Sequence, residues 1–506
     1  DNKYYVSASL RFDGSSKFKF NENRWGTFWS VGAGWRISSE PWMEGTKGWL
    51  DNLKVRASYG VLGNQNGVRN YSGYQTWSYG ASGWAGTGNS TYPTGITLSK
   101  GAWTNGGITW ENVKTADAGF DFTLFGGKLA GSFDWFNKQT DNAIWAQQVS
   151  LLAAGQAKLD MNTAGIRSRG VEIELNYQPV KTKDWDVILS VNGTHYNNIL
   201  TSVPEGTGND ALGGCWEAGS DAWSLGGDTG GGSNGYLRGV GKDYYNMYLY
   251  HYAGVAGNDG ITYYGNDGKQ YTGYKKGDAY AGMPLYTHVV TDAEAKAGTF
   301  GSAKAGDWVN TTNTGLASKV ELGDALPEWY GGFSANVRYK GLDLGVQLSY
   351  QIGGKFFSRE YWGGGDEGRY SAELMTSGVG LSTELYGNTW TENNTNAKFP
   401  MLIAHETIAR GGTGLANGAE NATDIALFDA SYLSVKNITL GYTFPKKWMN
   451  KAKIANLRIY ASADNPILIY GHKGVDPRWN MVGSLTVGPF SYAYLTTYNF
   501  GVNIDF

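Results

Sequence analysis

Two glutamates, Glu172 and Glu174, stand two positions apart in a stretch where apolar and polar residues alternate. On an extended strand this spacing places both carboxylates on one face, about 6–7 Å apart. Paired carboxylates at such separations can hydrolyse glycosidic bonds, so a glycosidase site is one interpretation. The interpretation that we favour is that both are solvated carboxylates on the polar face of a strand.

Two other kinds of segment resemble parts of ligand-binding loops. Asn-Asp-Gly occurs at 258–260 and at 266–268. Neither copy continues with the aspartate spacing and closing glutamate of a calcium loop, so we predict turns there. The glycine-rich stretch 226–233 is followed by neither a lysine nor a helical pattern. We therefore predict a flexible loop rather than a phosphate cradle.

The remaining polar residues do not form a catalytic or metal-binding motif. The zinc-protease motif His-Glu-x-x-His and the P-loop motif do not occur. The five histidines are scattered, and Cys215 is the only cysteine, so an intrachain disulfide is impossible. Lys and Arg number 42 against 45 Asp and Glu, a net charge of −3, which argues against a nucleic-acid partner. We predict no catalytic residue, no metal, no cofactor and no enzymatic activity.

Aromatic residues are concentrated in long segments between the predicted strands. Aromatic faces stack on sugar rings and supply apolar area in binding sites. The alternative is that these side chains pack the loops internally, and for any single residue this is the favoured interpretation. The candidate substrate-binding residues are Trp77, Trp84, Trp216, Trp223, Tyr361, Trp362 and Trp390, with Trp103, Trp145, Tyr244, Tyr245 and Trp308 in similar positions.

The composition predicts that β-strands position these residues. Glycine makes up 75 of the 506 residues, aromatics 14% and charged residues only 17%. Average proteins contain about 7% glycine and about 25% charged residues. Aromatic residues suit pleated sheets and glycine suits turns, whereas helical bundles need runs rich in Ala, Leu, Glu and Lys. A helical bundle or coiled coil is therefore excluded.

The last segment of the chain shows the strand pattern most clearly. From Tyr494 to Phe506, apolar and aromatic residues occupy alternate positions and mostly polar residues the others. The same alternation predicts about twelve strands in total. They cover residues 3–12, 29–37, 53–61, 113–125, 128–139, 171–178, 184–197, 329–340, 342–350, 432–444, 456–464 and 494–506.

The lengths of the strands and their connections favour a transmembrane antiparallel β-barrel over a soluble β-sandwich. Sandwich strands average about five or six residues, whereas these approach or exceed about ten. Short connections, at 125–128, 181–184 and 339–342, alternate with long ones. The long connections cover 64–109, 141–167, 198–327, 356–428 and 466–492. Outer-membrane barrels have short periplasmic turns and long extracellular loops.

A barrel of this kind has a polar lumen and an apolar surface towards lipid. The alternation predicts that Val171, Ile173, Leu175 and Tyr177 face lipid. The residues predicted to face the lumen are Arg56, Asp134, Glu172, Glu174, Arg338 and Asp343. If short turns are periplasmic, both chain ends lie on the periplasmic side.

An ordered set of short motifs resembles the SusC/RagA-type TonB-dependent transporters of Gram-negative outer membranes. Each motif is weak alone, but their order along the whole chain is specific. They are residues 11–17, 23–28, 33–38, 53–60, 63–64, 162–166, 168–175, 326–333, 432–442, 457–460, 464–465 and 474–477, and the terminal Phe506.

This resemblance implies active import of oligosaccharides or peptides across the outer membrane, powered through TonB, under a SusD-like lipoprotein lid. It implies a plugged barrel of about 22 strands, of which residues 1–506 would be the C-terminal portion. We therefore expect the plug domain and first strands, absent from this chain, to come from a preceding segment or a second chain. The alternatives are a passive porin-type channel and a surface glycan-binding barrel. An outer-membrane enzyme is the least favoured.

Overall fold

The computed structural model is built around one large antiparallel sheet. It describes residues 2–19, 22–72, 74–82, 95–100, 105–148, 158–204, 212–218, 235–313, 315–357, 383–401, 423–471, 476–479 and 494–506. Among these residues, no helix is both long and apolar enough to span a membrane.

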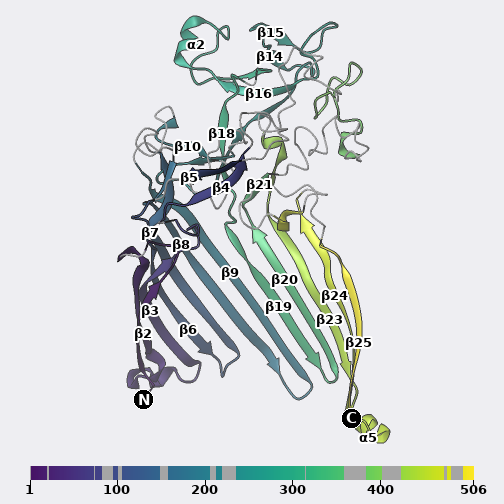
Figure 1. The fold of residues 1–506 in the computed structure, drawn as a ribbon. Helices are drawn as coiled ribbons and strands as arrows, with labels where there is room; N and C mark the ends of the chain where they lie inside the picture. Colours follow the sequence, from purple (N-terminus) through teal and green to yellow (C-terminus); the bar gives the residue numbers. More distant parts are fainter. Residues whose placement is uncertain are drawn as a thin grey trace.

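The large sheet has 12 strands, and all the predicted strands are confirmed. Each pairs with the next in chain order, so the sheet is an up-and-down meander (Figure 1). In order they are β1 (Tyr4–Gly14), β2 (Trp25–Arg36), β3 (Leu50–Asn64), β6 (Glu111–Leu124), β7 (Leu129–Gln148), β8 (Lys158–Lys181), β9 (Trp185–Ser202), β19 (Trp329–Tyr339), β20 (Leu342–Ile352), β23 (Tyr432–Thr443), β24 (Asn456–Tyr470) and β25 (Thr497–Asp505).

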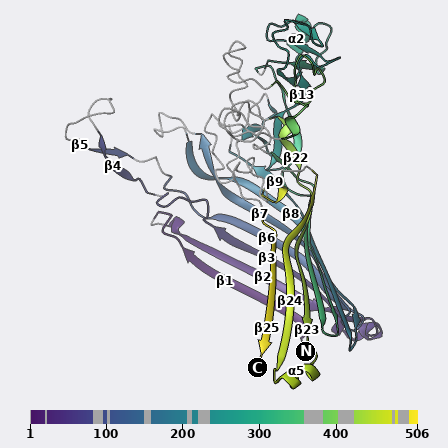
Figure 2. The same ribbon diagram turned by 90° about the vertical axis from the view of Figure 1, so that its right-hand side faces the viewer.

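The sheet is curved, and its two edge strands do not meet (Figure 2). β1 and β25 stand at opposite ends of the strand order, and each pairs with one neighbour among the described strands. The sheet therefore does not close on itself as a twelve-stranded barrel.

Short turns and the two chain ends share one end of the sheet (Figure 1). The β6–β7 turn uses positive φ at Phe125, Gly126 and Gly127, and the β19–β20 turn uses it at Lys340. The wider β2–β3 connection contains two 3₁₀ turns, η2 (Ile37–Ser39) and η3 (Pro41–Thr46). The β23–β24 connection contains the helix α5 (Lys446–Ala452). We name this the short-turn end.

One predicted loop is wrong in its extent. Residues 141–167 were expected to form a long connection, but β7 continues to Gln148 and β8 begins at Lys158, with these two residues paired. The register shifts between Thr140 and Ala143, and Asn142 has a φ of 57°. This bulge interrupts the alternation, so a reading based on period two ends the strand too early.

The long connections at the opposite end fold into a cap above the sheet (Figure 1). A four-stranded sheet contains β10 (Trp216–Ala218), β11 (Tyr236–Arg238), β12 (Asn246–Tyr250) and β18 (Lys319–Asp324). A five-stranded sheet contains β13 (Tyr252–Val255), β14 (Thr262–Tyr264), β15 (Gln270–Thr272), β16 (Pro284–Val289) and β17 (Trp308–Thr311). The pair β21 (Lys355–Phe357) with β22 (Leu427–Asp429) and helix α2 (Asp292–Ala297) complete it, whereas the hairpin β4 (Trp77–Ser82) with β5 (Gly95–Lys100) projects away from the cap (Figure 2).

Small apolar clusters hold the cap together. One cluster packs Met247 and Leu249 of β12 against Phe356 and Phe399, all at most 1% exposed. Another contains Tyr263 and Leu285, both fully buried, from the five-stranded sheet. Because these side chains come from distant parts of the sequence, the long connections form a folded layer with cores of their own.

Candidate functional site

The register of the large sheet separates its two faces. Val6 pairs with Ala33, and Ala33 with Ala57, so apolar residues of neighbouring strands lie side by side. At the other edge, Ala461 pairs with Phe500. Val6 and Phe500 are 86% and 84% exposed. The result is a continuous, exposed apolar face across the strands of the sheet, which a water-facing sheet would not present.

The opposite face carries the charges. Arg56 on β3 lies among three aspartates of β6 and β7. Its Nη2 is 2.6 Å from Oδ2 of Asp134, its Nε is 3.3 Å from Oδ1 of Asp121, and its Nη1 is 3.5 Å from Oδ1 of Asp117. Lys54 on β3 pairs with Asp121, so basic and acidic side chains alternate on this part of the face.

Glycine makes the shortest of these contacts possible. Gly119 on β6 pairs with Arg56 on one side and with Asp134 on the other. A Cβ atom at Gly119 would lie 2.1 Å from Oδ1 of Asp134 and 2.5 Å from the carbonyl oxygen of Phe133. The missing side chain leaves the space through which Arg56 reaches across β6.

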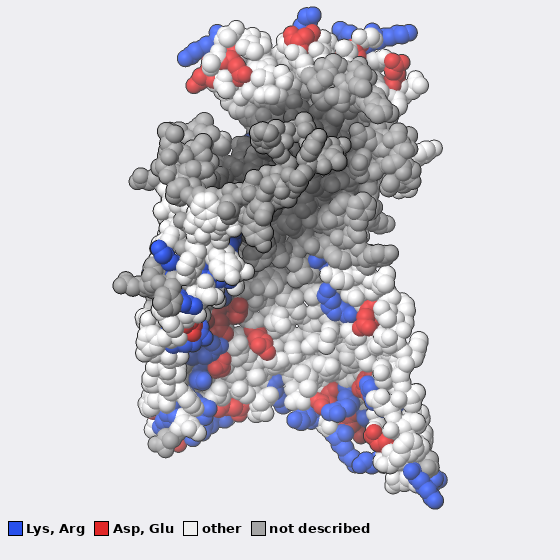
Figure 3. Space-filling view, viewed as in Figure 1, with Lys and Arg blue, Asp and Glu red and all other residues white. Residues whose placement is uncertain are grey.

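A second charged group lies nearer the short-turn end. Arg338 on β19 contacts Asp186 on β9, with Nη2 to Oδ2 at 2.6 Å. Arg458 on β24 reaches Asp343 on β20 at 2.5 Å, across Gly441 on β23. Figure 3 shows acidic and basic side chains gathered over the lower, hollowed part of the molecule.

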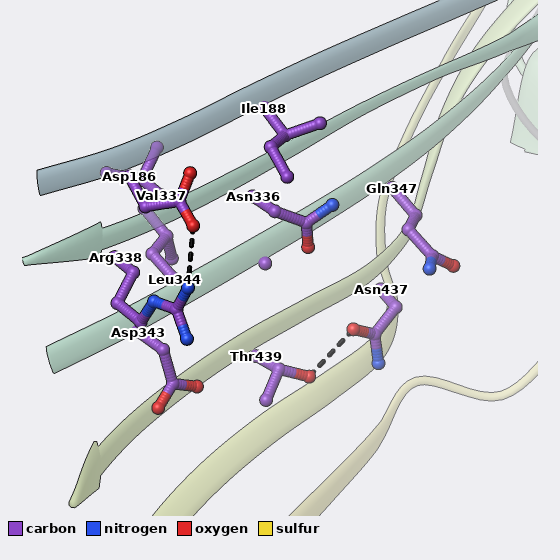
Figure 4. A pocket seen from close by; sticks show the side chains of 11 residues that line it. Asp186, Ile188, Asn336, Val337, Arg338, Asp343, Leu344, Gln347, Asn437 and Thr439 are labelled. Atoms are coloured by element: carbon purple, nitrogen blue, oxygen red, sulfur yellow. Dashed lines mark hydrogen bonds and ion pairs between the residues drawn. The ribbon is translucent and has the colours of Figure 1, made fainter. Parts of the chain in front are cut away.

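A shallow cavity of about 350 Å³ lies beside this second group. Figure 4 shows the Asp186–Arg338 ion pair at one side and the hydrogen bond from Thr439 to Asn437 at the other. The lining also includes the side-chain amides of Asn336 and Gln347. Such donors and acceptors can bind hydroxyl or peptide groups along a polar path.

The predicted lumen-facing residues lie on this same face. Glu172 pairs with Asp134 and with Thr194, and Glu174 pairs with Ser132 and Asn192. Both glutamates are exposed, and Glu174 accepts a hydrogen bond from Asn176 at 2.9 Å. This is the environment of solvated carboxylates. Within the described part of the chain, no three His, Cys, Asp or Glu side chains are grouped to hold a metal ion.

The candidate aromatic residues have different environments. Trp390 is 1% exposed and lies in a cluster with Val255 and Ala281, so its side chain packs the interior of the long connections. Trp216 is partly buried and packs edge-on against Trp145, which is 2% exposed. Trp77 on β4 is 61% exposed. Trp84, Trp223, Tyr361 and Trp362 lie outside the described residues.

Several other aromatic side chains in the same connections can be placed. Tyr244 is buried and packs edge-on against the partly buried Tyr245, while Trp308 is 55% exposed. Trp103 lies outside the described residues. Burial therefore separates the packing aromatics from exposed ones such as Trp77.

Comparison with known proteins identifies the family to which this chain belongs. The family model "TonB dependent receptor-like, beta-barrel" matches residues 1–295, which is more than half of the chain. The chain belongs to this family. The TonB-dependent receptor SusC of Bacteroides thetaiotaomicron is 26% identical over the whole chain, which covers 42% of that protein. The TonB-dependent receptor P3 of Formosa agariphila is 23% identical, again over the whole chain and 44% of the relative.

Solved structures agree on the fold of this TonB-dependent receptor chain. The structure of the RagAB peptide transporter matches all of the chain and 46% of the matched chain, with a TM-score of 0.72 and 21% identity. The chain spans less than half the length of these relatives. The resemblance to SusC/RagA-type transporters is confirmed, and so is a β-barrel fold of the outer membrane of Gram-negative bacteria.

The named relatives of this receptor chain are receptors and transporters rather than enzymes. The spacing Gly-x-Ser-x-Gly of serine hydrolases does occur once, at residues 231–235. That motif needs a strand-to-helix turn, whereas Gly235 leads directly into strand β11. Ser233 itself lies outside the described residues.

The structure adds charged residues that the sequence reading did not select. Asp117, Asp121, Asp186 and Arg458 lie on the polar face with the predicted set. The alternation alone assigns each of them to that face. The sequence alone predicts only part of the ion pairing, because local residue spacing does not determine which residues of distant strands lie opposite each other.

Proposed function

We propose that residues 1–506 form part of the barrel wall of a transporter that actively imports oligosaccharides or peptides across the outer membrane. The observation that carries this proposal is the separation of an exposed apolar face from a charged, amide-rich face through the register of the large sheet. The apolar face would contact lipid, and the polar face would line the path of the substrate.

The proposed transporter contains more than this chain. Within the described residues, β1 and β25 each have one edge without a neighbouring strand. An unsatisfied backbone group in hydrocarbon costs several kcal/mol, so both edges need partners. We infer that further strands and a plug domain complete the barrel, from a preceding segment or a second chain. The greater length of the relatives supports this inference.

Two partners follow from the same proposal. The energy for import would come from a TonB complex acting on the plug, so this chain would hydrolyse nothing. A SusD-like lipoprotein would close over the cap, which is a folded layer at the end opposite the short turns. The short-turn end would then face the periplasm.

The chemistry of the polar face suits more than one neutral substrate. Side-chain amides and hydroxyls around the cavity could bind sugar hydroxyls or peptide groups. The structural relative RagAB is described as a peptide transporter. The exposed Trp77 could stack on a sugar ring. We keep both substrate classes in the proposal.

Uptake measurements test the proposal against its alternatives. Labelled oligosaccharides and peptides are supplied to the source bacterium with the gene intact, deleted, and deleted then restored. The same strains are tested without functional TonB. Uptake that needs both the gene and TonB supports active import. Uptake that survives loss of TonB indicates a porin-type channel, and surface binding without uptake indicates a glycan-binding barrel.

A further inference from the structure

The connection between β23 and β24 is strongly basic. Residues 444–456 contain Lys446, Lys447, Lys451 and Lys453 and no acidic residue. All four lysines are exposed, and none forms an ion pair with a described carboxylate. The helix α5 is held by Met449, which is 7% exposed, so its lysines stay on the outside. In Figure 3, basic side chains occupy the lower right tip, where Figure 1 places α5.

An aromatic series connects this basic turn to the apolar face of the sheet. Tyr442 pairs with Leu342 and Ile459 and so belongs to that face. Its ring contacts Phe444 edge-on at 5.1 Å, and Phe444 lies 6.4 Å from the ring of Trp448 on α5. Trp448 is 55% exposed. Exposed tryptophan beside lysine, at the border of an apolar band, is typical of a membrane interface.

We propose that α5 and its flanking residues bind the headgroups of anionic phospholipids in the leaflet at the short-turn end. The ammonium groups would contact lipid phosphates, while Trp448 would lie at the boundary with the acyl chains. The site goes beyond the import function proposed above and depends only on the chain's position in the outer membrane. It would fix the depth of the barrel on the side of β23–β25.

Charge complementarity and position both favour lipid as the partner. Four cationic groups within eight residues attract an anionic surface, and each lysine near such a surface contributes about 1 kcal/mol, a roughly fivefold effect. The apolar face that begins at Tyr442 already requires lipid beside it. Other turns of the same end also carry exposed lysines, Lys47, Lys128, Lys181, Lys183 and Lys340, but acidic residues stand among them: Glu44 forms an ion pair with Lys47, and Asp184 follows Lys183.

Lipid retention tests the proposal. The protein is purified into detergent, mixed with equal amounts of phosphatidylglycerol and phosphatidylethanolamine, and analysed by native mass spectrometry. The neutral variant combines Lys446→Gln, Lys447→Gln, Lys451→Gln and Lys453→Asn. Asparagine is used at 453 because that residue has a φ of 58°, which asparagine tolerates. We expect the preference for phosphatidylglycerol to fall by about tenfold or more in this variant.

Two controls make the result specific. A second variant removes four exposed cap lysines, Lys275, Lys276, Lys296 and Lys304, and should keep the preference. A third variant replaces Lys446, Lys447 and Lys451 by arginine and should also keep it. An unchanged preference in the neutral variant would overturn the proposal, as would absence of any preference in the unmodified protein. Equal loss in the cap variant would also overturn it, because net charge alone would then explain the effect.

Discussion

Arg56 and Asp134 form an ion pair of 2.6 Å although their strands, β3 and β7, are not neighbours in the sheet. The strand between them is β6, and Gly119 is the residue that both flank. The same device recurs where Arg458 reaches Asp343 across Gly441. In both places a glycine on the polar face leaves room for an ion pair between two strands that are separated by a third strand.

Substitution of Gly119 tests whether the ion pair between Arg56 and Asp134 depends on the absence of a side chain at this position. We expect Gly119→Ala to reduce the free energy of unfolding by about 1–3 kcal/mol, because the added Cβ overlaps Asp134 and the Phe133 carbonyl. Denaturant titration in lipid vesicles, followed by the heat-modifiable band on gels, measures the loss. Gly345→Ala is the matched control, since its nearest contact would be 3.5 Å from Asn336. Equal losses in both variants would contradict the prediction.

A change of charge should affect stability differently on the two faces of β8. Ile173→Arg places a cation within the apolar face, beside Phe133 and Gly193, and should cost about 2–4 kcal/mol, the cost of a cation near the bilayer midplane. Glu172→Gln, on the polar face one position along, should change stability little. The same vesicle titration compares the two. If Glu172→Gln were the costlier change, the assignment of the faces would be wrong, since a slip of one residue exchanges them.

The cap should become less stable as pH rises towards neutrality because of Asp324. Burial raises the pKa of this carboxyl to about 6, and the neighbouring Asp243 adds to the increase. The folded cap therefore binds more protons than the unfolded one between about pH 4 and 6, so its stability falls as pH rises through this window. We expect Asp324→Asn to reduce this dependence and to stabilise the cap by up to about 2 kcal/mol at pH 7. Burial raises the pKa of Asp243 as well, so a smaller dependence of the same sign should remain.

The hydrogen-exchange rates of the backbone amides of β12 and β18 measure how the stability of the cap changes with pH. They are corrected for the pH dependence of the intrinsic exchange rate. Glu321→Gln on the same strand is the control with the opposite sign. Hydrogen bonding from Lys242 lowers the pKa of Glu321, so that carboxylate stabilises the cap above its ordinary pKa and loses its effect in acid. Identical pH profiles for Asp324→Asn and the unmodified protein would rule out the assignment to Asp324.

Two tryptophans of the long connections should behave differently. Trp390→Ala should destabilise the cap by about 3–5 kcal/mol, because it empties the cluster around Val255 and Ala281. Trp77→Ala should leave stability unchanged, because this side chain is 61% exposed. Limited proteolysis of the cap measures stability, and titration with labelled oligosaccharide measures binding. A cap that resists protease equally in both variants would show that Trp390 is not a packing residue.

The sequence by itself determined the strands of the large sheet and the face of each residue. A side-chain period of two is a local property, so Val171 and Glu172 could be assigned to opposite faces without any tertiary contact. Short turns extend this to neighbouring strands: the turn at 340–341 brings Arg338 opposite Asp343. The bulge at Asn142 shows the limit of such reading, because one extra residue breaks the period.

Only the tertiary structure decided which distant residues meet. The pairing of β9 with β19 spans the residues between Ser202 and Trp329, and no local spacing sets its register. The reach of Arg56 across Gly119 depends on the registers of β3, β6 and β7 together. Whether a loop tryptophan is buried, like Trp390, or exposed, like Trp77, depends on packing against residues far along the chain. Faces follow from backbone geometry within each strand, whereas contacts follow from how separate segments pack.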